Sequence, residues 1–137
     1  LRGDTVAFSD GSERGYDAII YATGYHISFP FLDRSIFDPE TDARRLYRRM
    51  VPPAHPGLIF AGLVQPIGPT IPLVEIQGKW IAALLSGTFP LPSKEGMEDE
   101  IADHLARQKR TFLDSDRYVL EVDFRRYAKQ MKSDARL

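Results

Sequence analysis

The chain contains no cysteine among its 137 residues, and this absence excludes disulfide bonds and thiolate chemistry. It also lacks any run of about 18 consecutive apolar residues, so we expect no membrane segment in this chain. The formal net charge of −1 gives no reason to expect nucleic acid or an anionic membrane surface as a partner. Together these absences fit a cytoplasmic globular protein.

Glycine-rich phosphate-binding sequences are also missing. No Gly-x-Gly pair occurs anywhere, so the chain has neither a dinucleotide fingerprint nor a phosphate loop. His26, His55 and His104 lie far apart and lack the spacing of metal ligands, so we expect surface or structural roles for them and no metal site. No serine lies in a nucleophile-elbow context. The sequence therefore offers no catalytic residue of its own.

What the chain does contain is a short apolar run that ends in small residues. Ala18–Tyr21 is predicted to be a strand buried on both faces, and Ala22, Thr23 and Gly24 follow it directly. Small residues at the end of a strand let another backbone or a ligand approach closely. Because open α/β sheets bind cofactors at such strand ends, this run indicates the edge of a cofactor site.

The same run has a consequence for completeness. The sequence predicts a hairpin at the start of the chain. Its first strand is Thr5–Phe8, its turn is Asp10–Ser12, and its return strand is the run at 17–25. A strand buried on both faces needs neighbouring strands, and the sequence shows no candidates for them. We therefore expect that the N-terminal part of a larger protein is missing from this chain.

A second apolar run, Gly57–Gly62, repeats this pattern, and a short alternating strand is predicted before it over 45–51. The loop from Leu63 to Thr70 is rich in glycine and proline and leads into a helix expected over 72–86. Free N–H groups at a helix N-terminus attract negative charge or carbonyl oxygens. Residue patterns alone leave a structural turn and a cofactor contact at even odds here, and the second strand-end motif favours the cofactor.

Two more helices are predicted after prolines 90 and 92. Ser93 is a candidate N-cap for a helix over 94–112, with Met97, Ile101, Leu105 and Phe112 on its apolar side, and Asp123 is a candidate cap for a helix over 123–132. The acidic run Glu98–Glu100 is interpreted as favourable interaction with the helix dipole. The basic residues 44, 45, 48 and 49 are expected to be solvated on an exposed strand.

In order along the chain, these segments resemble flavin-containing monooxygenases, class B flavoprotein monooxygenases of the dimethylaniline-oxidising type. Ala-Thr-Gly-Tyr at 22–25 is shared with Baeyer–Villiger monooxygenases, whereas the block around the predicted helix is more specific and favours oxidation of heteroatoms. The match covers most of the chain and consists of these segments: Asp17–Tyr25, Phe29–Leu32, Leu46-Tyr47, Pro52-Pro53, Gly62–Gly68, Pro72-x-x-Glu75-x-Gln77-Gly78-Lys79-Trp80, Leu91–Ser93 and Val122–Phe124.

The resemblance implies an α/β fold, the C-terminal part of a Rossmann-like two-domain FAD/NAD(P)-binding protein. Residues 1–92 would complete the FAD/NADP-binding core, and 93–137 would be a helical extension. Thr23 and Gly24 would lie close to cofactor, while Gln65, Gly68 and Thr70 would line the flavin ring. The helix after Thr70 would point its N-terminus at the edge of the flavin that is negatively charged when reduced.

The activity that the resemblance implies is NADPH-dependent reduction of FAD, capture of O₂ as a C4a-hydroperoxyflavin, and oxygenation of an amine nitrogen or sulfide sulfur of a small molecule. The cofactor would do this chemistry, and the chain by itself would be inactive. Two alternatives stay open: a Baeyer–Villiger-type monooxygenase fragment that oxidises ketones, and a non-catalytic module or subunit of a split flavoprotein.

Overall fold

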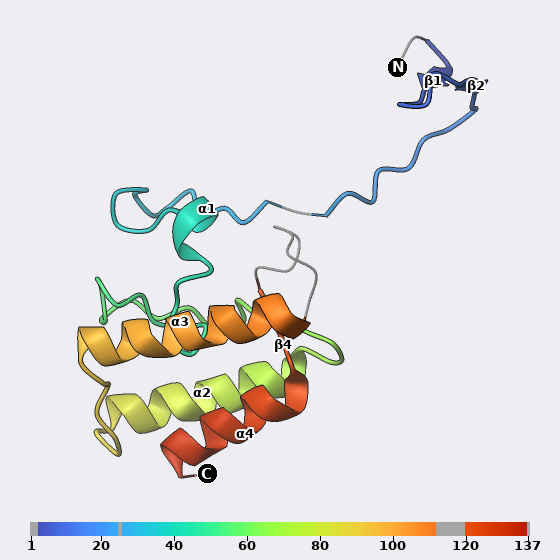
Figure 1. Cartoon of the computed structure of the whole chain (residues 1–137). Helices are drawn as coiled ribbons and strands as arrows, with labels where there is room; N and C mark the ends of the chain where they lie inside the picture. The colour runs from blue at the N-terminus through green and yellow to red at the C-terminus, as the bar shows by residue number, and fades with distance from the viewer. Residues whose placement is uncertain (1–2, 25, 112–119, 137) are drawn as a thin grey trace.

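The computed structural model describes residues 3–24, 26–111 and 120–136. Within them the chain mixes short strands with longer helices, and the N-terminal hairpin lies well away from the three long helices (Figure 1). In chain order the elements are β1 Thr5–Ala7, β2 Glu13–Gly15, α1 Pro39–Asp42, β3 Gln65–Pro66, α2 Ile71–Leu85, α3 Lys94–Thr111, β4 Glu121–Val122 and α4 Phe124–Ala135.

The strands form two separate pairs. β1 and β2 pair antiparallel, with Thr5 opposite Gly15, across a turn that contains Gly11 at φ 83°. β3 and β4 pair parallel, with Gln65 opposite Glu121. A positive φ is strained for most residues but accessible to glycine, which explains the residue at the hairpin turn.

The predicted return strand at Ala18–Tyr21 is wrong for this structure. The return strand is β2, and residues 17–24 form no strand, while Tyr25 lies outside the described residues. Ile20 is 91% exposed and Tyr21 is 71% exposed. An apolar run becomes a buried strand only when neighbouring strands satisfy its backbone groups and cover its faces, and no described segment of this chain pairs with it.

Two further strand predictions are also wrong. Within 45–51 only an isolated bridge joins Tyr47 to Val51, because Arg48 and Arg49 adopt φ values of 51° and 60° and reverse the chain. Gly57–Gly62 forms no strand, although the Phe60 N–H donates to the Met50 carbonyl over 2.9 Å. A strand prediction from local apolar character misses such left-handed turns, which are uncommon for residues other than glycine.

The helix predictions are confirmed, since their signals are local. α2 ends where expected, with Gly87 just beyond it at φ 74°. Ser93 Oγ accepts from the Gly96 N–H at the start of α3, and the Asp123 side chain accepts from the Arg126 N–H at 2.7 Å. Phe112, expected on the apolar side of α3, lies outside the described residues.

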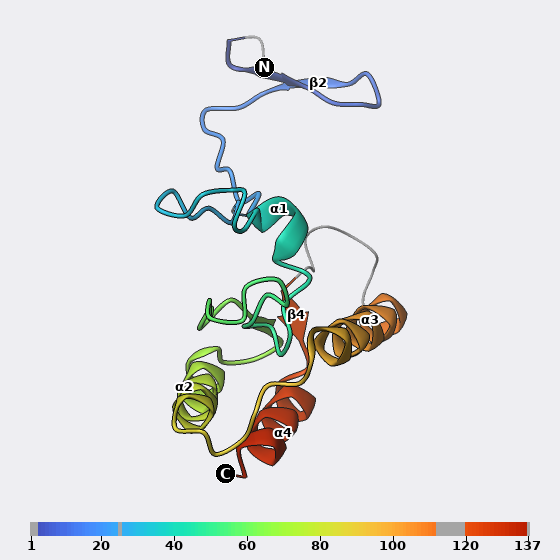
Figure 2. The ribbon, with the colours of Figure 1, turned by 90° about the vertical axis from the view of Figure 1, so that its left-hand side faces the viewer.

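Two apolar clusters hold the chain together. The larger lies among α2, α3 and α4, which Figure 2 shows grouped around a common interior, and Leu73, Trp80 and Met131 are fully buried in it. The smaller forms around Phe37 and Leu46, where the Phe37 and Phe60 ring centroids are 4.4 Å apart and Phe29 packs alongside. The β3–α2 loop, residues 63–70, therefore begins beside buried Val64 and leads into α2, whose first buried residue is Leu73.

Candidate functional site

The β3–α2 loop carries three of the five residues predicted to contact cofactor. Gln65 lies in β3, where its backbone N–H donates to the Leu120 carbonyl at 2.8 Å, while its side chain is exposed. Gly68 has φ 129°, and no atom lies within 4 Å of the position that a Cβ would take there. The loop is thus fixed through its backbone and open on the side where Gly68 lies, which suits the close approach of a ligand.

Thr70, the third of these residues, is the N-cap of α2. Its carbonyl accepts from the N–H groups of Leu73 and Val74, but its side chain makes no capping hydrogen bond. Pro72 has no N–H to satisfy, and Ile71 is 83% exposed. The first turn of this 15-residue helix is therefore left without a side-chain cap, and its dipole favours an anionic or carbonyl group from outside.

Thr23 and Gly24 are not brought next to this loop. They lie in the extended segment between β2 and α1, and both views show that segment away from the start of α2 (Figures 1 and 2). Gly24 has φ 90° and open space around its Cα. The described residues therefore do not bring together the two segments that were predicted to share one site.

A buried chain of hydrogen bonds lies next to the loop, and the sequence analysis did not predict it. The Gln77 side chain, fully buried in α2, accepts from the Gly62 N–H at 2.8 Å and donates to the Tyr127 hydroxyl at 2.7 Å. That hydroxyl donates to the Arg48 carbonyl at 2.7 Å. The sequence signal for these bonds is Gln77 on an otherwise apolar face of the helix, because a buried amide needs hydrogen-bond partners.

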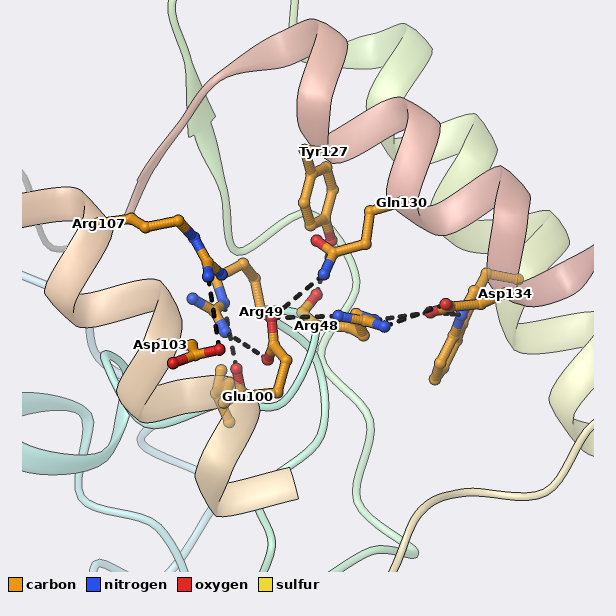
Figure 3. Close-up of polar contacts among 10 residues, drawn as sticks. Arg48, Arg49, Glu100, Asp103, Arg107, Tyr127, Gln130 and Asp134 are labelled. Carbon is orange, nitrogen blue, oxygen red and sulfur yellow. Dashed lines mark hydrogen bonds and ion pairs between the residues drawn. The ribbon is translucent and has the colours of Figure 1, made fainter. Parts of the chain in front are cut away.

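Of the four basic residues expected in solvent, Arg44 and Arg45 are exposed, but the side chains of Arg48 and Arg49 are mostly buried. Figure 3 shows both of them among acidic side chains of α3 and α4. The Arg48 guanidinium lies between Glu100 of α3, at 3.1 Å, and Asp134 of α4, at 2.6 Å, and Arg49 contacts Glu100 at 3.1 Å. The Asp134 carboxylate also accepts from the Trp80 indole at 3.3 Å. We call Arg48, Arg49, Glu100 and Asp134 the arginine cluster. Glu100 therefore pairs with cations, and the dipole interpretation of the acidic run missed this role.

Burial and ion pairing act on these guanidinium groups in opposite directions. Burial lowers the pKa of Arg48, but the hydrogen bonds to Asp134 and the neighbouring negative groups raise that pKa overall. Burial lowers the pKa of Arg49 despite the attraction of Glu100. The sequence signal for this cluster is that the two arginines are flanked by apolar residues. These neighbours are buried in the structure: Leu46, Tyr47, Met50 and Val51. Charges buried among apolar residues must be paired.

His104 lines a pocket of about 380 Å³ between α3, β4 and α4. Burial, together with the charges of Arg49, Arg107 and Arg126, lowers its pKa to about 3. The imidazole is therefore neutral at physiological pH, in agreement with a structural role. Among residues 3–24, 26–111 and 120–136, no group of three or more histidine or acidic side chains could hold a metal ion.

Comparison with known proteins assigns the family. The family model described as flavin-binding monooxygenase-like matches residues 1–135. The chain belongs to this family. Mouse flavin-containing monooxygenase 5 is 37% identical over 122 residues, which cover 87% of this chain and 23% of that protein. Rat dimethylaniline monooxygenase [N-oxide-forming] 2 is 36% identical over 134 residues, covering 96% of this chain and 25% of that protein.

A solved structure extends the assignment to the fold. S-allyl-L-cysteine S-oxygenase from Allium sativum matches with a TM-score of 0.76 and 30% identity, covering 98% of this chain and 31% of that chain. This confirms the predicted α/β fold class. The chain spans about a quarter of the length of the curated relatives it matches. None of the helices in the described parts of the chain has the length and apolar character that crossing a membrane requires.

Proposed function

We propose that this chain is the C-terminal portion of a FAD- and NADPH-dependent monooxygenase that oxygenates nucleophilic nitrogen or sulfur in small molecules. The observation that carries the proposal is the family match over residues 1–135. One relative is named as an N-oxide-forming enzyme and another as an S-oxygenase, which supports oxygenation at nitrogen or at sulfur. The coverage of about a quarter supports a fragment of a longer enzyme.

The residues of the β3–α2 loop fit a flavin. Gly68 leaves open space at its Cα, and the N-terminus of α2 has no side-chain cap, so Gln65, Gly68 and Thr70 would hold the ring's carbonyl edge. Thr23 and Gly24 would contact the same cofactor when the remaining strands of the longer protein are present. Bound flavin, reduced by NADPH, supplies the activation of dioxygen. This chain's part is to bind and orient the cofactor and to exclude water.

The chain lacks the glycine-rich turns that hold pyrophosphate, so we expect residues 1–92 to complete a nucleotide-binding core only together with the rest of the protein, with 93–137 as its helical extension. The 137-residue chain alone should then retain little or no FAD. Its partners are that missing portion, an amine or sulfide substrate, and O₂.

The test begins with the DNA upstream of Leu1, which should encode an in-frame Gly-x-Gly-x-x-Gly segment. We call the product of that longer reading frame, which includes residues 1–137, the continuous protein. It should carry stoichiometric flavin, measured by absorbance, and convert a sulfide to its sulfoxide with NADPH. The isolated 137-residue chain should do neither. Oxidation of a cyclic ketone in place of the sulfide would indicate the Baeyer–Villiger reaction. Tight, stoichiometric FAD on the isolated chain would contradict the requirement for the missing portion.

A further inference from the structure

The hydrogen bonds behind the β3–α2 loop have no role in the chemistry proposed so far. We propose that Gln77 and Tyr127 are positioning residues, which hold the segment Gly62–Thr70 in the shape that receives the flavin. This inference rests on the proposed function for the identity of the ligand. The physical claim about the loop rests on the structure alone.

Both ends of this segment are attached to α2. Its first residue, Gly62, donates its N–H to Gln77 in the middle of the helix, and its last residue, Thr70, is the helix N-cap. Gly62 has φ 83°, and a Cβ there would lie 3.8 Å from Val74 of the same helix. A loop held at both ends by one rigid helix has few ways to move, provided that the Gln77 contact is kept.

Gln77 can make that contact in only one orientation. Its Oε1 must face the Gly62 N–H, which is a donor only, so its Nε2 must face the Tyr127 hydroxyl. The hydroxyl can accept from Gln77 because its own proton is donated to the Arg48 carbonyl. Each bond therefore fixes the direction of the next, from the Arg48 carbonyl to Gly62, the first residue of the segment Gly62–Thr70.

α4 supports the loop by a second connection. Tyr127 lies on α4, and β4, which pairs with β3 of the loop, is separated from that helix by Asp123 alone. Burial raises the pKa of Tyr127 to about 12, so the hydroxyl keeps its proton across the physiological range. A movement of α4 would therefore disturb the loop both at Gly62 and at β3.

The first test measures hydrogen exchange of the Gly62 amide in the 137-residue chain, relative to the amide of Trp80 in the core of α2. Gln77→Met removes the acceptor and should raise this ratio about tenfold or more. Tyr127→Phe keeps the ring and removes only the hydroxyl, and should raise the ratio by a smaller factor. Met131→Ala, on the same helix and in the same core, is the matched control, which lowers the thermal midpoint but leaves the ratio unchanged.

The second test measures flavin retention in the continuous protein by absorbance and by dissociation constant. The Gln77→Met and Tyr127→Phe variants should both bind FAD at least several-fold more weakly than the wild type. The Met131→Ala control should bind FAD as the wild type does at temperatures where it is folded. A Gly62 exchange ratio no higher than in the control would overturn the positioning role. Faster exchange with unchanged FAD affinity would overturn the flavin-facing role of the loop, while the sulfide assay would still support the proposed function. A wild-type protein that retains no flavin would overturn both.

Discussion

At Arg48 and Arg49 two adjacent guanidinium groups share the carboxylate of Glu100, and Arg48 also pairs with Asp134. Their side chains are only 12% and 6% exposed, so their charges cannot be screened by water. Two cations and two carboxylates leave the cluster close to neutral. The balance depends most on Glu100, because it is the carboxylate that contacts both guanidinium groups.

Glu100→Gln should therefore destabilise the chain by about 3 kcal/mol, since it leaves buried positive charge without full compensation. Urea unfolding followed by circular dichroism measures this loss. Glu98→Gln is the matched control, because the Glu98 side chain is 46% exposed and lies 4.0 Å from Lys94. It should change the free energy of unfolding by no more than about 0.5 kcal/mol. Equal effects of the two substitutions would contradict a buried cluster.

His104 makes stability depend on pH. Its pKa is about 3 in the folded chain, below the ordinary histidine value of 6.5, because burial and the charges of Arg49, Arg107 and Arg126 disfavour the imidazolium. The unfolded chain thus binds the proton more readily between these values. Stability from this source is present above about pH 6.5 and is lost as the pH falls, by at most about 2 kcal/mol between pH 7 and pH 5.

Urea unfolding at pH 7 and pH 5 measures that loss, and His104→Gln should reduce the difference between the two. Subtracting the stability profile of His104→Gln from that of the wild type isolates the contribution of the imidazole. The contribution of Glu121, a carboxyl group of the same pocket whose pKa is raised by burial, is common to both profiles and cancels. His55→Gln, at an exposed position, should keep the wild-type profile. A His104 variant that loses as much stability on acidification as the wild type would contradict the assignment.

At the scale of elements, the helices could be predicted because their signals are local. Asp123 and Ser93 cap within three residues, and the apolar positions of α2 follow one helical face. Ala18–Tyr21 and Gly57–Gly62 could not be predicted in this way, because a strand exists only where another segment pairs with it. Strand pairing is decided by residues distant in sequence, and the apolar character of the run alone does not show whether they are present.

In the candidate site, too, local features could be predicted from the sequence and long-range contacts could not. The exposed N-terminus of α2 could be predicted, since a proline-rich loop before a helix indicates it locally. The Gly62–Gln77–Tyr127 chain and the arginine cluster could not, because their members come from segments far apart in the sequence. Which glutamine or arginine turns inward depends on how α3 and α4 pack, and residue type alone predicts solvent exposure for arginine.

At the scale of the whole molecule, large apolar side chains are exposed in the extended segment after β2 and beside the candidate site, and also at Phe31 and at Leu85 at the end of α2. Ile20 and Tyr21 in the extended segment, and Ile67 and Ile71 beside the candidate site, are each more than 70% exposed. Single exposed apolar residues are common, but four within two short segments are what we expect of surfaces that another part of the proposed longer protein would cover. This agrees with a chain that spans about a quarter of its relatives.

Ile20→Asp separates the stability of this chain from the assembly of the whole protein. Ile20 is 91% exposed here, so the substitution should change the free energy of unfolding of the 137-residue chain by less than about 0.5 kcal/mol. In the continuous protein the same position would be covered by neighbouring strands, and a buried carboxylate there should abolish flavin retention. Leu85→Asp, at an apolar position that is 76% exposed at the end of α2, is the control and should retain flavin. Full flavin content in the Ile20 variant would show that Ala18–Tyr21 stays exposed in the assembled protein, and Thr23 and Gly24 would then lose their predicted place beside the cofactor.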